Sequence, residues 1–124
     1  MAPNYETNSS MEKEWVLTYE GWTYRIPERM RPGLIRYRDK GVIPGDFLQA
    51  IICNNLVRAA GRADGENLGN LPAYANWLYN HLPLVAYGSE ESMERWNEEG
   101  GSEGILKERK ENAHLFEVPK PETP

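Results

Sequence analysis

The sequence predicts a mainly α protein: a compact bundle of about four helices with a short N-terminal β-hairpin and disordered tails. Three observations support this fold class. Apolar residues recur at helical spacing in the middle of the chain, proline and glycine interrupt that spacing at intervals, and both ends are polar and aperiodic. At 124 residues the chain is long enough for one domain and too short for two.

The predicted organisation has three parts. Residues 1–13 form a disordered arm, residues 14–100 form the helical domain, and residues 101–124 form an acidic tail that is disordered or weakly helical. Any helix in this tail is expected around Ile105–Glu111.

A β-hairpin is predicted at the start of the domain. The runs Trp15–Tyr19 and Trp22–Ile26 are rich in aromatic and β-branched residues, and Glu20-Gly21 joins them. Because an isolated hairpin is only marginally stable, we expect it to lie against the helices.

The first helix is expected from about Pro32 to Lys40, after a helical turn that begins at Pro27. Proline is tolerated in a first helical turn because its missing N–H would have been unpaired there, and Gly41 ends the helix. The residues expected to face inward are Leu34, Ile35 and Tyr37.

The second helix is predicted as one continuous segment from Pro44 to Gly61. Asp46 lies in its first turn, where the helix dipole favours a carboxylate. Its buried stripe, at a spacing of about 3.6 residues, is expected to be Leu48, Ile51, Ile52, Leu56 and Ala59.

The third helix is predicted over about residues 66–82, ended by Pro83, and it has two alternative starts. Asp64 as N-cap leaves Pro72 in the helix interior, whereas Asn70 as N-cap places Pro72 in the first turn. The expected buried stripe is Leu71, Tyr74, Ala75, Leu78 and Leu82.

The fourth helix is expected to begin at Ser89, a good N-cap residue. It turns Met93 and Trp96 to one side and ends at Gly100-Gly101.

Charge is unevenly distributed along the chain. The formal net charge is −5, yet residues 25–62 hold eight basic and three acidic residues. The overall acidity argues against non-specific nucleic-acid binding, which depends on basic excess. The polar start does not resemble a signal peptide, and no run approaches the ~18 apolar residues of a membrane span. We therefore expect a cytoplasmic protein that does not enter a membrane.

The sequence does not indicate a catalysed reaction, a metal or a cofactor. It lacks a nucleotide-binding glycine loop, a zinc-helix signature and a nucleophile elbow. His81 lies at a helix end, where an imidazole can cap carbonyls, and His114 lies in the tail. The single cysteine, Cys53, is expected to be a small buried hydrophobe.

A cluster of amide and guanidinium groups is the first candidate site. Asparagine is a poor helix former, so several in predicted helices require a reason. The cluster is expected either to bind a small anionic ligand or a partner's backbone, or to tie the second and third helices together. The candidate residues are Asn55, Arg58, Arg62, Asp64, Asn67 and Asn80.

A basic and aromatic patch is the second candidate. Aromatic rings and arginines together can stack and pair with a nucleotide or a single strand, although a solvated helix face has the same composition. The patch comprises Trp22, Tyr24, Arg29, Arg36 and Tyr37.

Several short motifs between Ile26 and Trp96 resemble a family of small uncharacterised proteins of tailed phages and prophages. The motifs are Ile43-Pro44-Gly45-Asp46-Phe47-Leu48, Asn54-Asn55-Leu56, Arg62-Ala63-Asp64 with Asn67, Tyr79-Asn80 with Pro83, and Gly88-Ser89 with Trp96. Family members show Asn-Asp where this chain has Asn54-Asn55. The resemblance implies a phage origin and no particular activity.

Two function classes follow from these features. The first is a non-enzymatic binding protein that counters host antiviral defence by binding a host protein or sequestering a nucleotide signal. The second is an accessory protein of phage DNA metabolism that uses the basic segment 25–62. A homodimer is expected in either case, because the predicted core is small and rich in aromatic residues.

Overall fold

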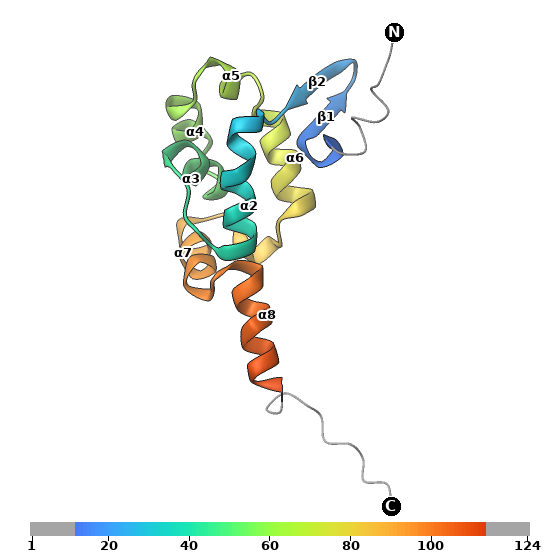
Figure 1. The fold of residues 1–124 in the computed structure, drawn as a ribbon. Coiled ribbons are helices and arrows are strands. Elements are labelled where there is room, and N and C mark those ends of the chain that lie inside the picture. Colours follow the sequence, from blue (N-terminus) through green and yellow to red (C-terminus); the bar gives the residue numbers. More distant parts are fainter. Residues whose placement is uncertain (1–11, 114–124) are drawn as a thin grey trace, which may run out of the picture.

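The computed structural model describes residues 12–113 and confirms the mainly helical class with an N-terminal hairpin (Figure 1). Within that range seven α-helices replace the expected four, because two predicted helices are each divided and a further helix, α8, forms after residue 100. The bounds are η1 (Lys13–Trp15), β1 (Val16–Tyr19), β2 (Trp22–Arg25), η2 (Glu28–Met30), α2 (Arg31–Lys40), α3 (Asp46–Ile52), α4 (Leu56–Arg62), α5 (Gly65–Leu68), α6 (Leu71–His81), η3 (Leu84–Ala86), α7 (Glu90–Glu99) and α8 (Gly101–Glu111). The arm and tail predictions for residues 1–11 and 114–124, and His114, lie outside the described residues.

The hairpin forms where it was predicted. Glu20 and Gly21 both have positive φ, 51° and 84°, as a two-residue turn matched to the strand twist requires. At its base, the N–H of Arg25 donates to the Asn70 side chain at 2.8 Å, so β2 is attached to the start of α6.

Helix α2 has the predicted ends. Pro32 lies in its first turn, and Gly41 follows its last residue with a left-handed φ of 71°. The N–H of Gly41 donates to the Tyr37 carbonyl at 2.9 Å, which satisfies one of the unpaired carbonyls at the helix end.

The prediction of a continuous helix over residues 44–61 is wrong. The chain breaks at Cys53-Asn54 into α3 and α4, and Asn54 takes a left-handed φ of 61°. Asparagine tolerates this conformation better than most residues, and Asn55 then caps the new helix. Because α4 starts in a new direction, Leu56 is 69% exposed instead of buried.

The third predicted helix is also two helices, and both proposed starts are used. Asp64 caps the short α5, and Asn70 stands at the N-cap position of α6 with Pro72 in its first turn. Pro72 therefore does not lie in a helix interior. Ala75, expected in the buried stripe, is exposed, whereas Trp77 is fully buried.

Aromatic side chains hold the hairpin and the helices together. Trp15 and Trp77 stack with ring centroids 5.4 Å apart, which joins η1 to α6. Phe47 of α3 meets Tyr74 of α6 edge to face at 5.2 Å. Such contacts add stability beyond the area that they bury.

Helix α7 begins and ends as predicted, and α8 then continues from its end. The Ser89 side chain accepts the Ser92 N–H, Met93 and Trp96 are buried, and Gly100 has a left-handed φ of 79°. Helix α8 is a regular helix that begins at Gly101, four residues before the weak helix expected at Ile105.

The corner between α7 and α8 packs against the C-terminal end of α2. The Trp96 indole N–H donates to the Tyr37 carbonyl at 2.8 Å, and the Asn97 amide donates to the Gly41 carbonyl at 2.8 Å. The Tyr37 carbonyl thus accepts a second hydrogen bond beside that from Gly41, and the Gly41 carbonyl, just beyond the helix end, gains a partner. Of the helices in residues 12–113, none has the length and apolar character needed to cross a membrane.

Candidate functional site

The predicted amide and guanidinium cluster consists largely of structural contacts. The Asn55 side chain accepts the Arg58 N–H at 3.0 Å and caps α4, and the Asp64 carboxylate accepts the Asn67 N–H at 2.8 Å and caps α5. These two residues therefore have a clear local role, which is to start helices after turns.

The other two amides of the cluster are also bonded within the chain. Asn67 is the one buried polar residue of the described chain, and its side chain accepts a hydrogen bond from the Tyr74 hydroxyl. The Asn80 amide donates to the Asn76 carbonyl at 3.0 Å and to its side chain at 2.9 Å, so it bonds inside α6.

The two arginines of the cluster behave differently. Arg62 pairs with Asp46 at 2.7 Å and so ties α4 to α3, although both side chains are at least half exposed. An ion pair this exposed contributes about 0–1 kcal/mol. Arg58 is exposed and forms no ion pair with any described residue.

Further ion pairs join η2 to the start of α5. Arg29 contacts Asp64 at 2.7 Å and Glu66 at 3.1 Å. The pKa of Asp64 is lowered, first by the hydrogen bond from the Asn67 N–H and then by Arg29, and the carboxylates raise the pKa of Arg29. Asp46, Asp64 and Glu66 are thus all bound to arginines.

Ion pairs also neutralise most of the basic segment 25–62. Six of its eight basic residues contact acidic side chains, which leaves Arg36 and Arg58 without such a partner among residues 12–113. Several of the acidic partners, such as Glu12, Glu14 and Glu103, come from the flanking segments. The basic residues therefore do not form a continuous positive face.

The basic and aromatic patch is not assembled as predicted. Tyr37 is fully buried, its hydroxyl donates to the Ala86 carbonyl at 2.7 Å, and burial raises its pKa. Arg29 forms ion pairs with carboxylates at the start of α5, while Arg36 is exposed. Of the two hairpin aromatics, Tyr24 is half-buried against the core and Trp22 is 69% exposed.

The hairpin register brings an unpredicted residue, Tyr19, beside Trp22. Tyr19 and Trp22 are direct cross-strand partners, and so are Leu17 and Tyr24. Side chains alternate between faces along a strand, so these four residues share one face. We call this face the hairpin surface.

The hairpin surface changes from buried to exposed along its length. Leu17 and Tyr24 at its base are half-buried, whereas Tyr19 and Trp22 next to the turn are 63% and 69% exposed. The pairing of Tyr19 with Trp22 was available from the sequence, because a two-residue turn at Glu20-Gly21 places the flanking residues opposite one another.

The remaining titratable candidates pack against apolar groups. The ring of His81 lies 6.3 Å from that of Trp77 at the end of α6. Cys53 is half-buried beside Met93, and burial raises the pKa of its thiol. Residues 12–113 contain no group of three or more His, Cys, Asp or Glu side chains placed to hold a metal ion.

The chain was compared with protein-family models, curated proteins and solved structures, and none of them matches it. The hairpin surface is the candidate site because its outer half is aromatic, exposed and attached to a packed base.

Proposed function

We propose that the protein is a non-enzymatic binding protein that recognises another protein through the hairpin surface. The observation that carries this proposal is the exposure of Trp22 and Tyr19 on one face. Tyrosine and tryptophan are the residues on which protein interfaces most often depend, because they bury a large area with few rotatable bonds.

Trp22 differs from the other tryptophans of the chain. Trp15, Trp77 and Trp96 are all at least 94% buried, as their exposures of 6%, 0% and 2% state. Trp22 contributes little to the core, so packing does not explain why a tryptophan stands at this position. A binding role accounts for it.

The base of the hairpin holds the exposed pair in place. Arg25 is bonded to Asn70 through its N–H and to Glu12 through its guanidinium at 2.9 Å. The N–H of Ile26 donates to the Trp15 carbonyl at 2.9 Å. A surface that is already ordered loses less conformational entropy when it binds.

The resemblance to small tailed-phage proteins supports a partner in the host cell. In this proposal the chain occludes a host protein, and interference with host antiviral defence is its purpose. The ion pairing of residues 25–62 favours this class over an accessory of DNA metabolism, because few of the basic side chains are left for phosphates.

The experiment is capture from a bacterial lysate with the wild-type chain and with Trp22→Ala. The matched control is Val57→Ala, which removes a side chain that is 83% exposed on α4. We expect Trp22→Ala to lose the partner, Val57→Ala to keep it, and both variants to unfold at the wild-type temperature.

Fluorescence quenching then tests whether the partner covers the hairpin surface. Since Trp22 is the one exposed tryptophan, acrylamide should quench one emission component in the free chain, and Trp22→Phe should lack that component. Bound partner should protect it. A partner that Trp22→Ala retains, or a Trp22 that stays quenchable in the complex, would refute the proposal.

A further inference from the structure

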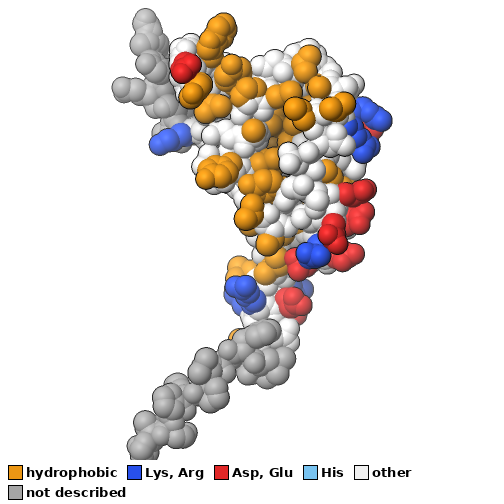
Figure 2. Space-filling view, turned by 180° about the vertical axis from the view of Figure 1, so that it is seen from behind, with side chains coloured by type: hydrophobic (Ala, Val, Ile, Leu, Met, Phe, Trp, Pro, Cys, Tyr) orange, Lys and Arg blue, Asp and Glu red, His pale blue; other side chains and the backbone are white. Residues whose placement is uncertain are grey.

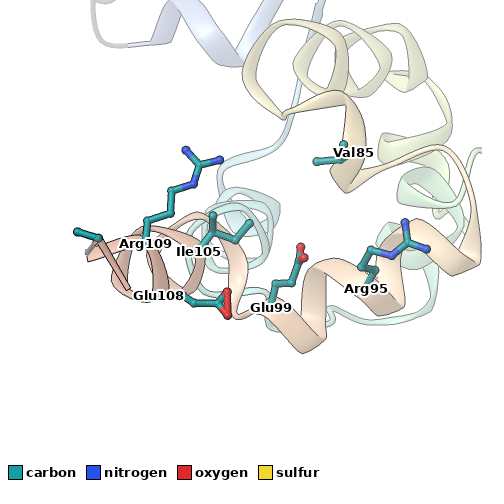
Figure 3. Close-up of a pocket in the computed structure, with 7 residues that line it drawn as sticks. Val85, Arg95, Glu99, Ile105, Glu108 and Arg109 are labelled. Carbon is teal, nitrogen blue, oxygen red and sulfur yellow. The ribbon is translucent and has the colours of Figure 1, made fainter. Parts of the chain in front are cut away.

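A groove lies where η3, α7 and α8 meet, on a surface that the proposed function does not use (Figure 3). It encloses about 870 Å³ and is lined by Val85, Arg95, Glu99, Ile105, Glu108, Arg109 and Ala113. Val85 is 65% exposed. Two further apolar residues of η3 and α8, Leu84 and Leu106, are 79% and 55% exposed. Val85 lines the groove, and Leu84 and Leu106 lie outside its lining, on η3 and α8. Exposed apolar residues in and around a groove are typical of a docking surface.

The charges of the groove balance one another. Two arginines and two glutamates line it, in a chain whose net charge is −5. Among the described residues Glu99, Glu108 and Arg109 form no ion pair, and Arg95 has only a 3.9 Å contact with Glu91. A second copy of the same groove therefore offers a glutamate for each arginine and an arginine for each glutamate.

We propose that the groove is the interface between two copies of this chain, related by a two-fold axis. In such an interface every contact between two different residues occurs twice, because the same patch is used on both copies. If α8 of one copy crosses α8 of the second antiparallel at Ile105, Arg109 lies four residues beyond the crossing. It then stands opposite Gly101 of the second copy.

Glu99 is two residues before Gly101, at the corner between α7 and α8. Figure 3 shows Glu99 and Ile105 beside the hollow under Val85, with Arg109 further along α8. The antiparallel crossing therefore pairs Arg109 of each copy with Glu99 of the other. The apolar side chains of Val85 and Ile105 lie between the two ion pairs.

The test is sedimentation equilibrium of the full chain with charge reversals at these two positions. We expect wild-type dimers, and we expect Arg109→Glu and Glu99→Arg each to weaken dimerisation at least roughly tenfold, because each creates two like-charge contacts. The double variant Glu99→Arg/Arg109→Glu restores both contacts with reversed signs, so it should dimerise like the wild type. The matched control is Arg58→Glu, which reverses an exposed arginine on α4 that has no ion-pair partner among residues 12–113, and it should leave dimerisation unchanged.

Four results would overturn the proposal. The first is a wild-type chain that stays monomeric up to roughly 100 μM, beyond the range of a weak but specific interface. The second is single reversals that dimerise like the wild type, and the third is a double variant that does not recover. The fourth is a dimer that appears only after removal of residues 114–124, which would mean that the chain's own end occupies the groove. Loss of partner capture by Trp22→Ala bears on the proposed function alone.

Discussion

Gly41 and Gly101 illustrate what a single residue decides in this molecule. A Cβ on Gly41 would lie 2.7 Å from the Gly101 nitrogen and 2.7 Å from the Trp96 carbonyl oxygen, and Gly41 also has a positive φ of 71°. Backbone approaches backbone here, so no flexible side chain can move aside. Glycine is therefore required twice, for conformation and for space.

Gly41→Ala should lower the free energy of unfolding by about 2–5 kcal/mol, the combined cost of a left-handed alanine and of an overpacked contact. The measurement is urea denaturation. Gly61→Ala is the control, because Gly61 lies in α4 with open space around it. That change should raise stability by about 0.5–1 kcal/mol. A Gly41→Ala variant as stable as the wild type would show that the two helix ends do not meet.

Two neighbours are the main causes of the lowered pKa of Asp64, and the Glu66 N–H adds a smaller contribution. The Asn67 N–H is the larger cause and Arg29 is a smaller one. In Arg29→Ala the pKa of Asp64 should therefore rise but remain below its ordinary 3.8. NMR titration of the side-chain carboxyl measures it. A value at or above 3.8 in the variant would show that Arg29, and not the cap, sets the pKa.

The same shift has a consequence for stability against pH. A carboxyl whose folded pKa is depressed stabilises the fold above its unfolded pKa, and that contribution is lost as the pH falls through the folded value. For Asp64 the loss therefore occurs below pH 3.8. Asp64→Asn should remove this part of the acid sensitivity.

At the scale of elements, the break between α3 and α4 is the main departure from the predicted fold. Asn55 ends one segment and begins the next: its N–H donates to the Ala50 carbonyl at 2.9 Å, and its side chain caps α4. The second asparagine, Asn54, supplies the left-handed turn. The two asparagines are poor helix formers, and their presence here is explained by their roles in a turn and in a helix cap.

Asn55→Ala should lower the free energy of unfolding by about 0.5–2 kcal/mol, because the Arg58 N–H loses its acceptor. Asn55→Asp is the control and should be close to neutral, since aspartate caps equally well. The sign of the change discriminates between the two folds. In a continuous helix, alanine would replace a poor helix former and stabilise the chain.

Helix α8 is attached to the body by contacts that its polar sequence did not reveal. Ile105 packs against the core, and Lys40 of α2 pairs with Glu103 at 2.9 Å. Figure 1 shows α8 extending from the end of α2, and Figure 2 shows hydrophobic side chains spread over the body above it. These contacts indicate that α8 contributes to the stability of the domain.

A chain that ends after Glu103 should therefore melt at least about 4–8 °C lower than the wild type, the shift that corresponds to roughly 1 kcal/mol in a domain of this size. A chain that ends after Ala113 is the control, because it keeps α8 and every described contact. Calorimetry compares the two. Equal melting temperatures for all three chains would show that α8 adds no stability.

At the scale of the whole molecule, acidic residues from both sides of the basic segment 25–62 form ion pairs with it. Arg25 and Arg31 meet Glu12, Arg38 meets Glu14, and Lys40 meets Glu103. The charge difference between segments, clear in the sequence, is thereby cancelled in space. The whole chain has a net charge of −5, and within residues 12–113 most basic side chains of the middle segment are paired with acidic ones.

Binding to DNA or RNA should accordingly be weak, because phosphate contacts supply most of the non-specific affinity. Gel-shift titration at physiological salt checks this with single- and double-stranded probes. Affinity in the sub-micromolar range for any of them would contradict the expectation and revive the accessory role in DNA metabolism.

Features governed by neighbouring residues could be read from the sequence. Glu20-Gly21 predicted the hairpin, Gly41 and Gly100 predicted two helix ends, and Ser89 predicted a helix start. Each depends on backbone preferences that act over a few residues, so no knowledge of the fold is needed. The mainly helical class follows from the same local signals.

Only the tertiary structure decided which surfaces meet. Tyr37 lies in the core and not in the predicted patch, because Ala86 and Trp96, 49 and 59 residues later in the chain, form hydrogen bonds with it. Leu56 became exposed because α4 turned away from α3. The candidate site differs from the predicted one for the same reason. Most side chains of the polar cluster form helix caps or ion pairs, whereas Trp22 is exposed next to Tyr24, which packs partly against the core. Such outcomes depend on contacts between distant segments, and no local pattern encodes them.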